Sequence, residues 1–371
     1  MTFAAFLRKD RFVPALTVAL ALIVPTTPAS AASSSSASRA RTTRPAATLA
    51  QAKPSSKTNA TATASKRSYS ASVAKARRAR VAQARATAKA RDIREVQTPR
   101  FTVDEAGQEV PDVRAAAAII YNPETQQVLW QSNAQEERSI ASITKVMTAL
   151  VFLQSGTPLD MPVTVQRTDV YRASTTYLRA GYQLTPDDLL HLLLIGSDNA
   201  AARALARVSS YGSEDFIAQM NAKASELGLS TTHYADPSGL LAANVSSAYD
   251  MARLITVAAS DERIGSIMRL ATYTVGSGKT AINVHSTNHL VREGDVDVRG
   301  GKTGFISRSG YCLATLLRLP QTGQQVAVVV LGAQSNAGRF WETRHLFNWM
   351  ATHTQKLLSI TGTEQAQQQQ H

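Results

Sequence analysis

The sequence has few of the residues that build metal centres and disulfide frameworks. Cys312 is the single cysteine among 371 residues, so no disulfide can form within one chain. None of the seven histidines belongs to a His-x-x-x-His pair on a predicted helix. We therefore expect neither a metal nor another cofactor. A lone cysteine in an apolar stretch is most often a core residue, which makes Cys312 a poor candidate for a nucleophile.

Long apolar runs are scarce too. Phe12 to Val24 follows a cluster of basic residues and precedes Ala29-Ser-Ala31, which has the small-x-small form of a cleavage site. This order predicts a secretory signal peptide over residues 1–31. The run is shorter than the roughly 20 residues of a transmembrane helix, and an uncleaved anchor is the alternative. We expect secretion across the inner membrane and a periplasmic or cell-wall-associated protein.

Residues 32–104 contain almost no large apolar side chains. Between 32 and 100 there are sixteen Lys and Arg residues against two acids, a net charge of +14. Because the whole chain carries +13 and residues 1–31 carry +2, residues 101–371 carry −3. A segment that cannot bury a core is expected to be disordered, so residues 32–104 are predicted to form a basic tether.

The charge of this basic tether favours anionic partners. For an exported chain, anionic wall polymers or a membrane surface suit the charge, and nucleic acid is not expected. A solvated spacer without a specific partner is the alternative. The basic run at residues 74–80 is expected to become helical on an anionic surface.

The pattern of apolar residues changes along the rest of the chain. Two apolar runs near 115–120 and 126–130 indicate a hairpin. From about 185 to 257 the patterns are mainly helical, and one helix start is marked by Thr185 and Asp188 around a proline. Strand patterns dominate after residue 270.

A final helix is predicted from about Arg339 to Thr352, ahead of a polar tail at 356–371. Strands at both ends with helices between them indicate one antiparallel sheet closed by the two ends of a folded domain, residues 105–355. We therefore predict an α/β (α+β) fold in which helices flank this sheet and an all-helical lobe is inserted.

Ser142 and Lys145 lie one turn apart in a helix that is predicted to begin just before them. Ser142 would fall in the first turn, where free backbone N–H groups and the helix dipole favour developing negative charge. A hydroxyl beside an amine is a candidate nucleophile–base pair. Ser72 and Lys75 have the same spacing within the basic tether, so the spacing alone is typical of a solvated helix face.

Two further motifs follow in order. Ser197-Asp-Asn199 lies at a predicted break between helices, and Lys302-Thr-Gly304 begins 105 residues after Ser197. Taken singly, the first is typical of a helix cap and the second of a turn. A second Ser-x-Asn begins at Ser286, but we prefer Ser197 because a helix break can point both side chains into a cleft.

With these motifs in this order, the sequence resembles the serine-type D-Ala-D-Ala peptidases, the low-molecular-mass penicillin-binding proteins of peptidase family S11. It is most similar among them to the small soluble D-alanyl-D-alanine endopeptidases. The resemblance covers about 110–350 and is carried by residues 141–149, 287–291, 302–305 and 310–313. It implies a β-lactamase/DD-peptidase-like fold, peptidoglycan stem peptides as substrates and β-lactam antibiotics as covalent inhibitors. We expect a monomer.

In such a site Ser142 would attack the carbonyl of D-Ala and form an acyl-enzyme, while a neutral Lys145 takes the proton. Burial and the neighbouring cation Lys302 would both lower the pKa of Lys145. Ser197 would relay the proton to the leaving amine, since a hydroxyl both donates and accepts. The Asn199 amide would hold Lys145 and the substrate backbone.

The resemblance further implies an oxyanion hole made by the backbone N–H groups of Ser142 and Phe305. Lys302 and Thr303 would bind the substrate carboxylate through a charge-assisted bond. Gly304 would leave room for a strand-like substrate to lie close.

Three functions remain open at this point. Among peptidases, the segment at Thr287 and the few residues after the last predicted strand favour an endopeptidase acting on cross-links, with a carboxypeptidase close behind. A class A-like β-lactamase would need a glutamate to activate water, and no Glu-x-x-Leu-Asn pattern lies between Ser197 and Lys302. A non-catalytic wall-binding protein is the third alternative.

Overall fold

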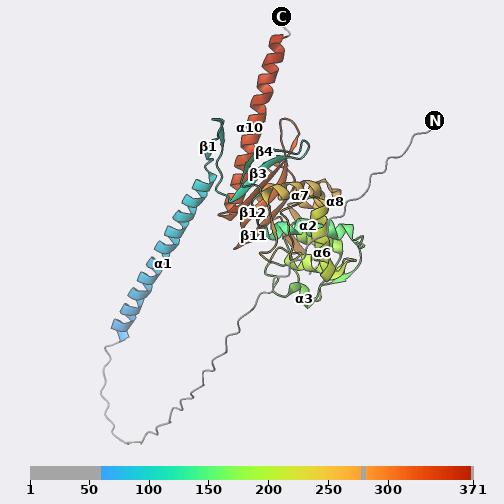
Figure 1. Ribbon diagram of the computed structural model, residues 1–371. Helices are drawn as coiled ribbons and strands as arrows, with labels where there is room; N and C mark the ends of the chain where they lie inside the picture. Colours follow the sequence, from blue (N-terminus) through green and yellow to red (C-terminus); the bar gives the residue numbers. More distant parts are fainter. Residues whose placement is uncertain (1–59, 277–280, 369–371) are drawn as a thin grey trace, which may run out of the picture. The chain divides into compact units, whose positions relative to one another are not determined.

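The computed structural model describes residues 60–276 and 281–368 (Figure 1). The predicted signal peptide therefore lies outside the described residues. The chain divides into a unit that ends at Tyr69 and a second unit, Ser70–His371, which contains the sheet and its helices. Within the described ranges, no helix is both long and apolar enough to cross a bilayer.

A five-stranded antiparallel sheet forms the centre of the second unit, with the strand order β11-β12-β13-β3-β4. Its strands are β3 (Ala117–Asn122), β4 (Gln127–Ser132), β11 (Asp297–Ile306), β12 (Gly310–Arg318) and β13 (Gln325–Ala333). The first strand of this sheet in the chain pairs with the last, and Ile119 lies opposite Val329. The predicted sheet, closed by both ends of the domain, is confirmed.

Helices cover both faces of this sheet (Figure 1). Because successive strand residues point to opposite faces, Ile119 packs into a core shared with α7 (Ala248–Ser260) and α8 (Glu262–Met268). Ile120 packs into a second core beneath α10 (Asn336–Gln368). The final helix is thus longer than predicted and continues through the segment expected to be a polar tail.

The inserted lobe between β4 and β11 is mainly helical, as predicted. Its helices are η1 (Ala141–Ile143), α2 (Thr144–Gln154), α3 (Arg167–Val170), α4 (Pro186–Leu194), α5 (Asn199–Val208), α6 (Gly212–Glu226), α7, α8 and α9 (His289–Glu293). The start of α4 is the predicted one, since the Thr185 hydroxyl accepts from the backbone N–H of Asp188 at 3.1 Å and Asp188 accepts in return.

Short strands hold the segments between these helices. The pairs are β5 (Arg138–Ser139) with β8 (Val245–Ser246), β6 (Val163–Thr164) with β7 (Gln183–Leu184), and β9 (Thr272–Val275) with β10 (Ile282–His285). The β5–β8 pair lies directly before η1 and so fixes the chain where it enters the Ser142 turn.

Of the disordered basic tether predicted over residues 32–104, residues 32–59 lie outside the described residues, and the described part differs from the prediction. Residues Ala60–Gln97 form one helix, α1, and every described side chain on it is exposed. The prediction considered only the lack of a core, whereas a long sequence rich in Ala and Arg has a high helix propensity without one. The folded part also begins before residue 105, because β1 (Phe101–Val103) pairs with β2 (Glu109–Pro111).

Candidate active site

Ser142 lies in η1, a single 3-10 turn that leads into α2. The helix therefore starts two residues later than the sequence suggests, and Ser142 remains at its N-terminal edge. Ala141 before it has φ 49°, a left-handed conformation that is costly for a residue with a Cβ. Gly239 lies so close that an added Cβ would be 2.0 Å from the Ala141 carbonyl oxygen. This backbone is therefore held by the surrounding structure.

Lys145 is fully buried one turn below Ser142. Its Nζ lies 2.9 Å from Ser142 Oγ, 2.6 Å from Asn199 Oδ1 and 2.5 Å from the Ser238 carbonyl oxygen. Burial lowers the pKa of Lys145 to about 7, with a smaller lowering from Arg203, although the carboxylates of Asp236 and Asp198 raise it. At neutral pH a substantial fraction of this amine is uncharged and can accept a proton.

The break between α4 and α5 positions the second motif. Asp198 is the N-cap of α5 and accepts from the backbone N–H of Ala201 at 2.9 Å, so it has a structural task. Asn199 donates to the Ala173 carbonyl at 2.7 Å, which fixes its amide so that Oδ1 faces Lys145. Ser197 has φ 58° and Ser174, which lines the same cavity, has φ 53°, so two further left-handed conformations lie beside the site.

The third motif lies on β11, on the opposite side of the cleft. Lys302 is buried, and its Nζ donates to Ser197 Oγ at 2.8 Å and to the Thr303 carbonyl at 2.9 Å. Burial lowers the pKa of Lys302 well below its ordinary value, and the cations Lys145 and Arg339 lower it further. Lys145 thus lowers the pKa of Lys302, but the low pKa of Lys145 comes from burial and Arg203 and not, as the sequence suggested, from Lys302.

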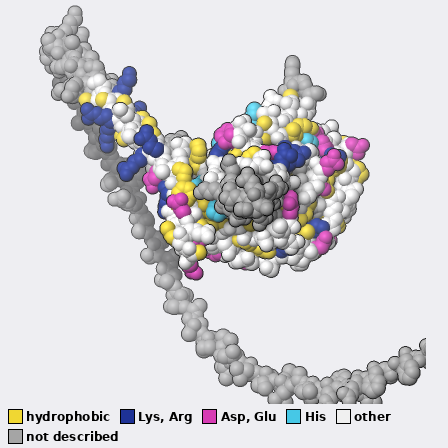
Figure 2. Space-filling view, turned by 90° about the horizontal axis from the view of Figure 1, so that it is seen from above, with side chains coloured by type: hydrophobic (Ala, Val, Ile, Leu, Met, Phe, Trp, Pro, Cys, Tyr) yellow, Lys and Arg dark blue, Asp and Glu magenta, His cyan; other side chains and the backbone are white. Residues whose placement is uncertain are grey.

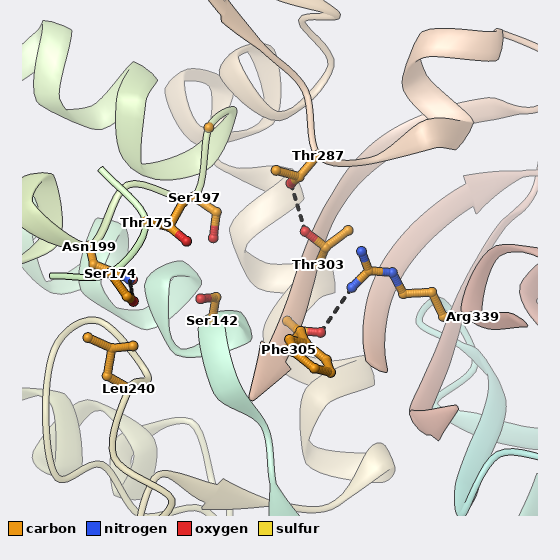
Figure 3. Close-up of a pocket in the computed structure, with 12 residues that line it drawn as sticks. Ser142, Ser174, Thr175, Ser197, Asn199, Leu240, Thr287, Thr303, Phe305 and Arg339 are labelled. Atoms are coloured by element: carbon orange, nitrogen blue, oxygen red, sulfur yellow. Dashed lines mark hydrogen bonds between the residues drawn. The ribbon is translucent and has the colours of Figure 1, made fainter. Parts of the chain in front are cut away.

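A cavity of about 200 Å³ lies between these motifs, and Ser142 and Ser197 point into it (Figure 3). It is lined by Ser142, Ser174, Thr175, Gly196, Ser197, Asn199, Leu240, Thr287, Thr303, Gly304, Phe305 and Arg339. The structure thus brings all three motifs together. Ser286 lies outside this lining, and Asn288 caps α9.

The structure explains the glycine at position 304 by a contact other than the one predicted. A Cβ there would lie 2.6 Å from the carbonyl oxygen of Ile140 and 3.2 Å from the backbone nitrogen of Ser142. Glycine therefore lets β11 pack directly against the turn that carries Ser142, whereas the sequence argument assigned the space to a substrate. Phe305 follows with its ring 48% exposed and stacked on Tyr311 at 4.2 Å.

Arg339 is a cavity residue that the sequence does not reveal. It comes from the first turn of α10 and is buried. Its Nη1 donates to the Gly304 carbonyl at 2.9 Å and to the Cys312 carbonyl at 3.2 Å, and its buried Nε has no hydrogen-bond partner among the described residues. Burial lowers the pKa of Arg339 to about 10, so it stays charged at neutral pH. It adds a fixed positive charge behind β11.

Thr287, which begins a segment that carries the resemblance, also lines the cavity, and its Oγ1 lies 2.7 Å from Thr303 Oγ1. Among residues 60–276 and 281–368, no group of three or more His, Cys, Asp or Glu side chains could hold a metal ion. The side chains at and directly beneath the cavity offer hydroxyls, an amide, amines and a guanidinium.

A serine hydroxyl beside a buried amine, in a cleft between a helical lobe and an antiparallel sheet, defines a serine acyl-transfer enzyme of the β-lactamase/DD-peptidase-like fold. Comparison with known proteins agrees. Residues 104–335 match the family model of peptidase family S11, D-alanyl-D-alanine carboxypeptidase. The chain belongs to this family, and the predicted fold and the predicted serine-type D-Ala-D-Ala peptidase are confirmed at this level.

Among its relatives are two D-alanyl-D-alanine endopeptidases. The chain is 33% identical to that of Pseudomonas aeruginosa over 65% of this chain and 78% of the relative, and 32% identical to that of Escherichia coli over 65% and 79%. The Streptomyces K15 DD-transpeptidase has a similar structure, with a TM-score of 0.61 and 29% identity, over 64% of this chain and 97% of that one. Penicillin-binding protein D2 of Listeria monocytogenes, in a cefotaxime-bound form, has a TM-score of 0.57 and 28% identity, over 65% and 98%.

Proposed function

We propose that Ser142 is the nucleophile of this peptidase and Lys145 its general base. The observation that carries the proposal is the 2.9 Å contact between Lys145 Nζ and Ser142 Oγ in a buried setting that leaves the amine partly neutral. The Ser142 proton passes to Lys145 as Oγ bonds to the D-Ala carbonyl carbon. The oxyanion forms beside the backbone N–H groups of Ser142 and Phe305.

Ser197 then donates a proton to the leaving nitrogen as the peptide C–N bond breaks. Its oxygen already accepts from Lys302, so its own hydrogen is free to point into the cavity. The proton lost by Ser197 is replaced from the protonated Lys145, directly or through water. Water then hydrolyses the ester on Ser142 and restores the enzyme.

Intact-mass measurement after treatment with penicillin tests this assignment. We expect one covalent adduct on the purified protein, lost in Ser142→Ala and kept in Ser72→Ala, which removes the serine with the same spacing in α1. An adduct that survives in Ser142→Ala would exclude Ser142 as the nucleophile. No adduct on the wild-type protein would favour the non-catalytic alternative.

The carboxylate of the leaving D-residue is expected to bind at Thr303, Lys302 and Arg339. Arg339 carries a fixed charge and Lys302 is a second basic group at the β11 side of the cavity, and Thr287 supports the Thr303 hydroxyl. Both cross-linked dimers and pentapeptide stems present such a carboxylate. We prefer cross-links because the relatives from P. aeruginosa, E. coli and Haemophilus influenzae are named endopeptidases.

Parallel digestion of purified muropeptides separates these two activities. An endopeptidase converts cross-linked dimers to monomers, whereas a carboxypeptidase shortens pentapeptide monomers by one D-Ala. Faster loss of dimers is the expected result. Exclusive shortening of monomers would overturn the endopeptidase preference without affecting the assignment of Ser142.

β-Lactams are proposed to inhibit the enzyme covalently. No carboxylate belongs to the lining of the cavity among the described residues, so this lining supplies no general base for fast deacylation. The expected result is a slowly hydrolysed adduct. Rapid turnover of a chromogenic cephalosporin by the purified protein would instead support the β-lactamase alternative.

We also propose that the enzyme works as a monomer in the periplasm or at the cell wall, where its basic segment binds anionic wall polymers or membrane lipids. Lys and Arg side chains gather along α1, and all its described side chains are exposed (Figure 2). Sedimentation with purified wall polymer or anionic vesicles, with and without residues 32–97, tests the binding. Equal sedimentation of both forms at low salt would exclude it.

A further inference from the structure

The loop from Asp236 to Leu241 forms a wall of the site that none of the three motifs marks. Its Ser238 carbonyl accepts from Lys145 Nζ, and its Leu240 lines the cavity. The Asp236 carboxylate organises the loop from inside, with one oxygen accepting from the backbone N–H groups of Ser238 and Gly239 at 2.6 and 2.7 Å. The other accepts from the N–H of Leu241 at 2.6 Å.

The Ser238 carbonyl decides how Lys145 presents its lone pair. A neutral amine has two N–H groups and one lone pair, and carbonyl oxygens can only accept. Asn199 Oδ1 and the Ser238 carbonyl, at 2.6 and 2.5 Å, therefore take both N–H groups. The lone pair is left facing Ser142 Oγ, the group that must lose a proton.

The same loop also fixes the backbone of the nucleophile. Gly239 contacts the Ala141 carbonyl so closely that no Cβ would fit, and the Pro237 carbonyl accepts from Thr148 of α2 at 2.6 Å. The hydrogen bonds of Asp236 therefore hold the 236–241 loop in the shape that orients Lys145 and that fixes the turn carrying Ser142.

We propose that Asp236 is a positioning residue for acyl transfer, which shapes the 236–241 loop so that Lys145 aims its lone pair at Ser142 and which places a negative charge near this amine. This inference rests on the proposed roles of Ser142 and Lys145. The other charged groups around Lys145 are Asp198 and Arg203 at α5 and Lys302 on β11.

The charge of Asp236 affects the pH dependence of the reaction, which a purely structural residue would leave unchanged. Burial raises the pKa of Asp236, but the hydrogen bonds from Leu241, Ser238 and Gly239 outweigh burial and keep it below its ordinary value. Asp236 is thus ionised at neutral pH, and its charge raises the pKa of Lys145. Removing that charge must shift the acidic limb of the pH–rate profile to lower pH.

The test is the second-order rate of acylation by a labelled penicillin, measured from pH 5 to 9 on the full chain. The wild-type rate should rise with pH through about 7 as Lys145 loses its proton. In Asp236→Asn, we expect the plateau rate to fall about tenfold, because the loop no longer holds the Ser238 carbonyl in place. The acidic limb should move to lower pH.

Asp250→Asn is the matched control. Asp250 is also a buried carboxylate that organises a loop, accepting from the N–H of Thr231 at 2.8 Å and from the hydroxyls of Thr231 and Thr232, but it does not contact the cavity. It should lower thermal stability and leave the limb in place. A limb in Asp236→Asn that coincides with those of wild type and Asp250→Asn would overturn the proposal.

Asp236→Glu keeps the test valid if Asp236→Asn does not fold. Glutamate keeps the charge but moves it by one methylene, so we expect a lower plateau with the acidic limb close to that of wild type. A plateau equal to the wild-type value would show that the position of this carboxylate is unimportant. If the wild-type profile itself has no acidic limb near pH 7, the proposed role of Lys145 fails, which is a different result from an unmoved limb.

Discussion

The two sides of the cleft each bury one lysine, and the surroundings of these lysines differ. Lys145, on the helical side, has three oxygen acceptors and the fields of Asp198 and Asp236. Lys302, on the sheet side, has two acceptors, and the charged groups that shift its pKa are the cations Lys145 and Arg339. On the helical side, carboxylates thus balance the charge of the buried lysine. On the sheet side, the groups that act on Lys302 are cations, and a substrate carboxylate can supply the missing negative charge.

The backbone conformations of the two sides also differ. The strained residues Ala141, Ser174 and Ser197 all belong to the helical side. On the sheet side, Lys302 to Phe305 are paired in regular antiparallel register with β12. The side to which we assign proton transfer thus depends on loops and caps that hold unusual conformations, while the side proposed to bind the carboxylate is a rigid strand.

The largest expected effect comes from breaking the helical side. Lys145→Met keeps most of the volume but removes the base, so acylation should fall by roughly 10²- to 10⁴-fold. The measurement is the rate of acylation by a labelled penicillin. The loss should be the same for a β-lactam with a free carboxylate and for its methyl ester, because Lys145 acts on Ser142 and does not bind the carboxylate.

Lys223→Met serves as the control for this change, since Lys223 forms an ion pair with Glu226 on α6, a helix that contributes nothing to the cavity. Its acylation rate should match that of wild type. A Lys145→Met protein that folds and still acylates at more than about a tenth of the wild-type rate would mean that another group takes the Ser142 proton.

The second largest loss of acylation rate is expected at the contact between the two sides, where Gly304 packs against the turn that carries Ser142. In Gly304→Ala, the new methyl must push β11 away from Ile140, and a displacement of even about 1 Å can cost about 10²-fold in rate. Gly300→Ala is the control, because it is overcrowded to a similar degree, 2.7 Å from Ala259 Cβ, but against helix α7. Thermal melting should fall in both variants, and acylation in Gly304→Ala alone. Equal acylation by the two variants would disprove the positional role of this contact.

Local patterns explain why much of the site could be predicted from the sequence. The proposed nucleophile–base pair, the helix break at Ser197 and the strand at Lys302 each depend on neighbours within a few residues. The sheet follows in the same way from the period of its apolar residues. The predicted hairpin is β3 and β4, and the predicted Thr185 cap has the expected hydrogen bonds.

The parts that could not be predicted depend on contacts between distant segments. The Ser238 carbonyl reaches Lys145 across 93 residues, and Arg339 reaches the Gly304 carbonyl across 35. No short motif encodes such a contact, because either residue alone is typical of a turn or a helix surface. The contact between Gly304 and the backbone of Ile140 was missed for the same reason, since Ile140 is far away in the sequence.

On the sheet side, Lys302→Met tests whether this lysine binds an anion. Losing a hydrogen bond to a charged group costs about 1.5–3 kcal/mol, so acylation by a β-lactam with a free carboxylate should fall about 10- to 100-fold. The methyl ester should lose much less, in contrast to the equal loss expected for Lys145→Met. An equal loss for acid and ester in Lys302→Met would indicate that this lysine takes part in proton transfer, and the division of tasks between the two sides would be wrong.

The smallest effect is expected at Thr287, which contacts the sheet side from the segment just before α9. Its Oγ1 lies 2.7 Å from Thr303 Oγ1, and Thr287→Val removes this bond while keeping the shape of the side chain. A typical hydrogen bond contributes about 1 kcal/mol, so binding of the free carboxylate should weaken about fivefold. Thr274→Val, which removes a hydroxyl bonded to Asn283 on an exposed hairpin, is the control and should leave acylation unchanged. If Thr287→Val lowers acylation by the acid and by the ester to the same extent, then Thr287 holds the strand as a whole and does not orient the Thr303 hydroxyl toward the carboxylate.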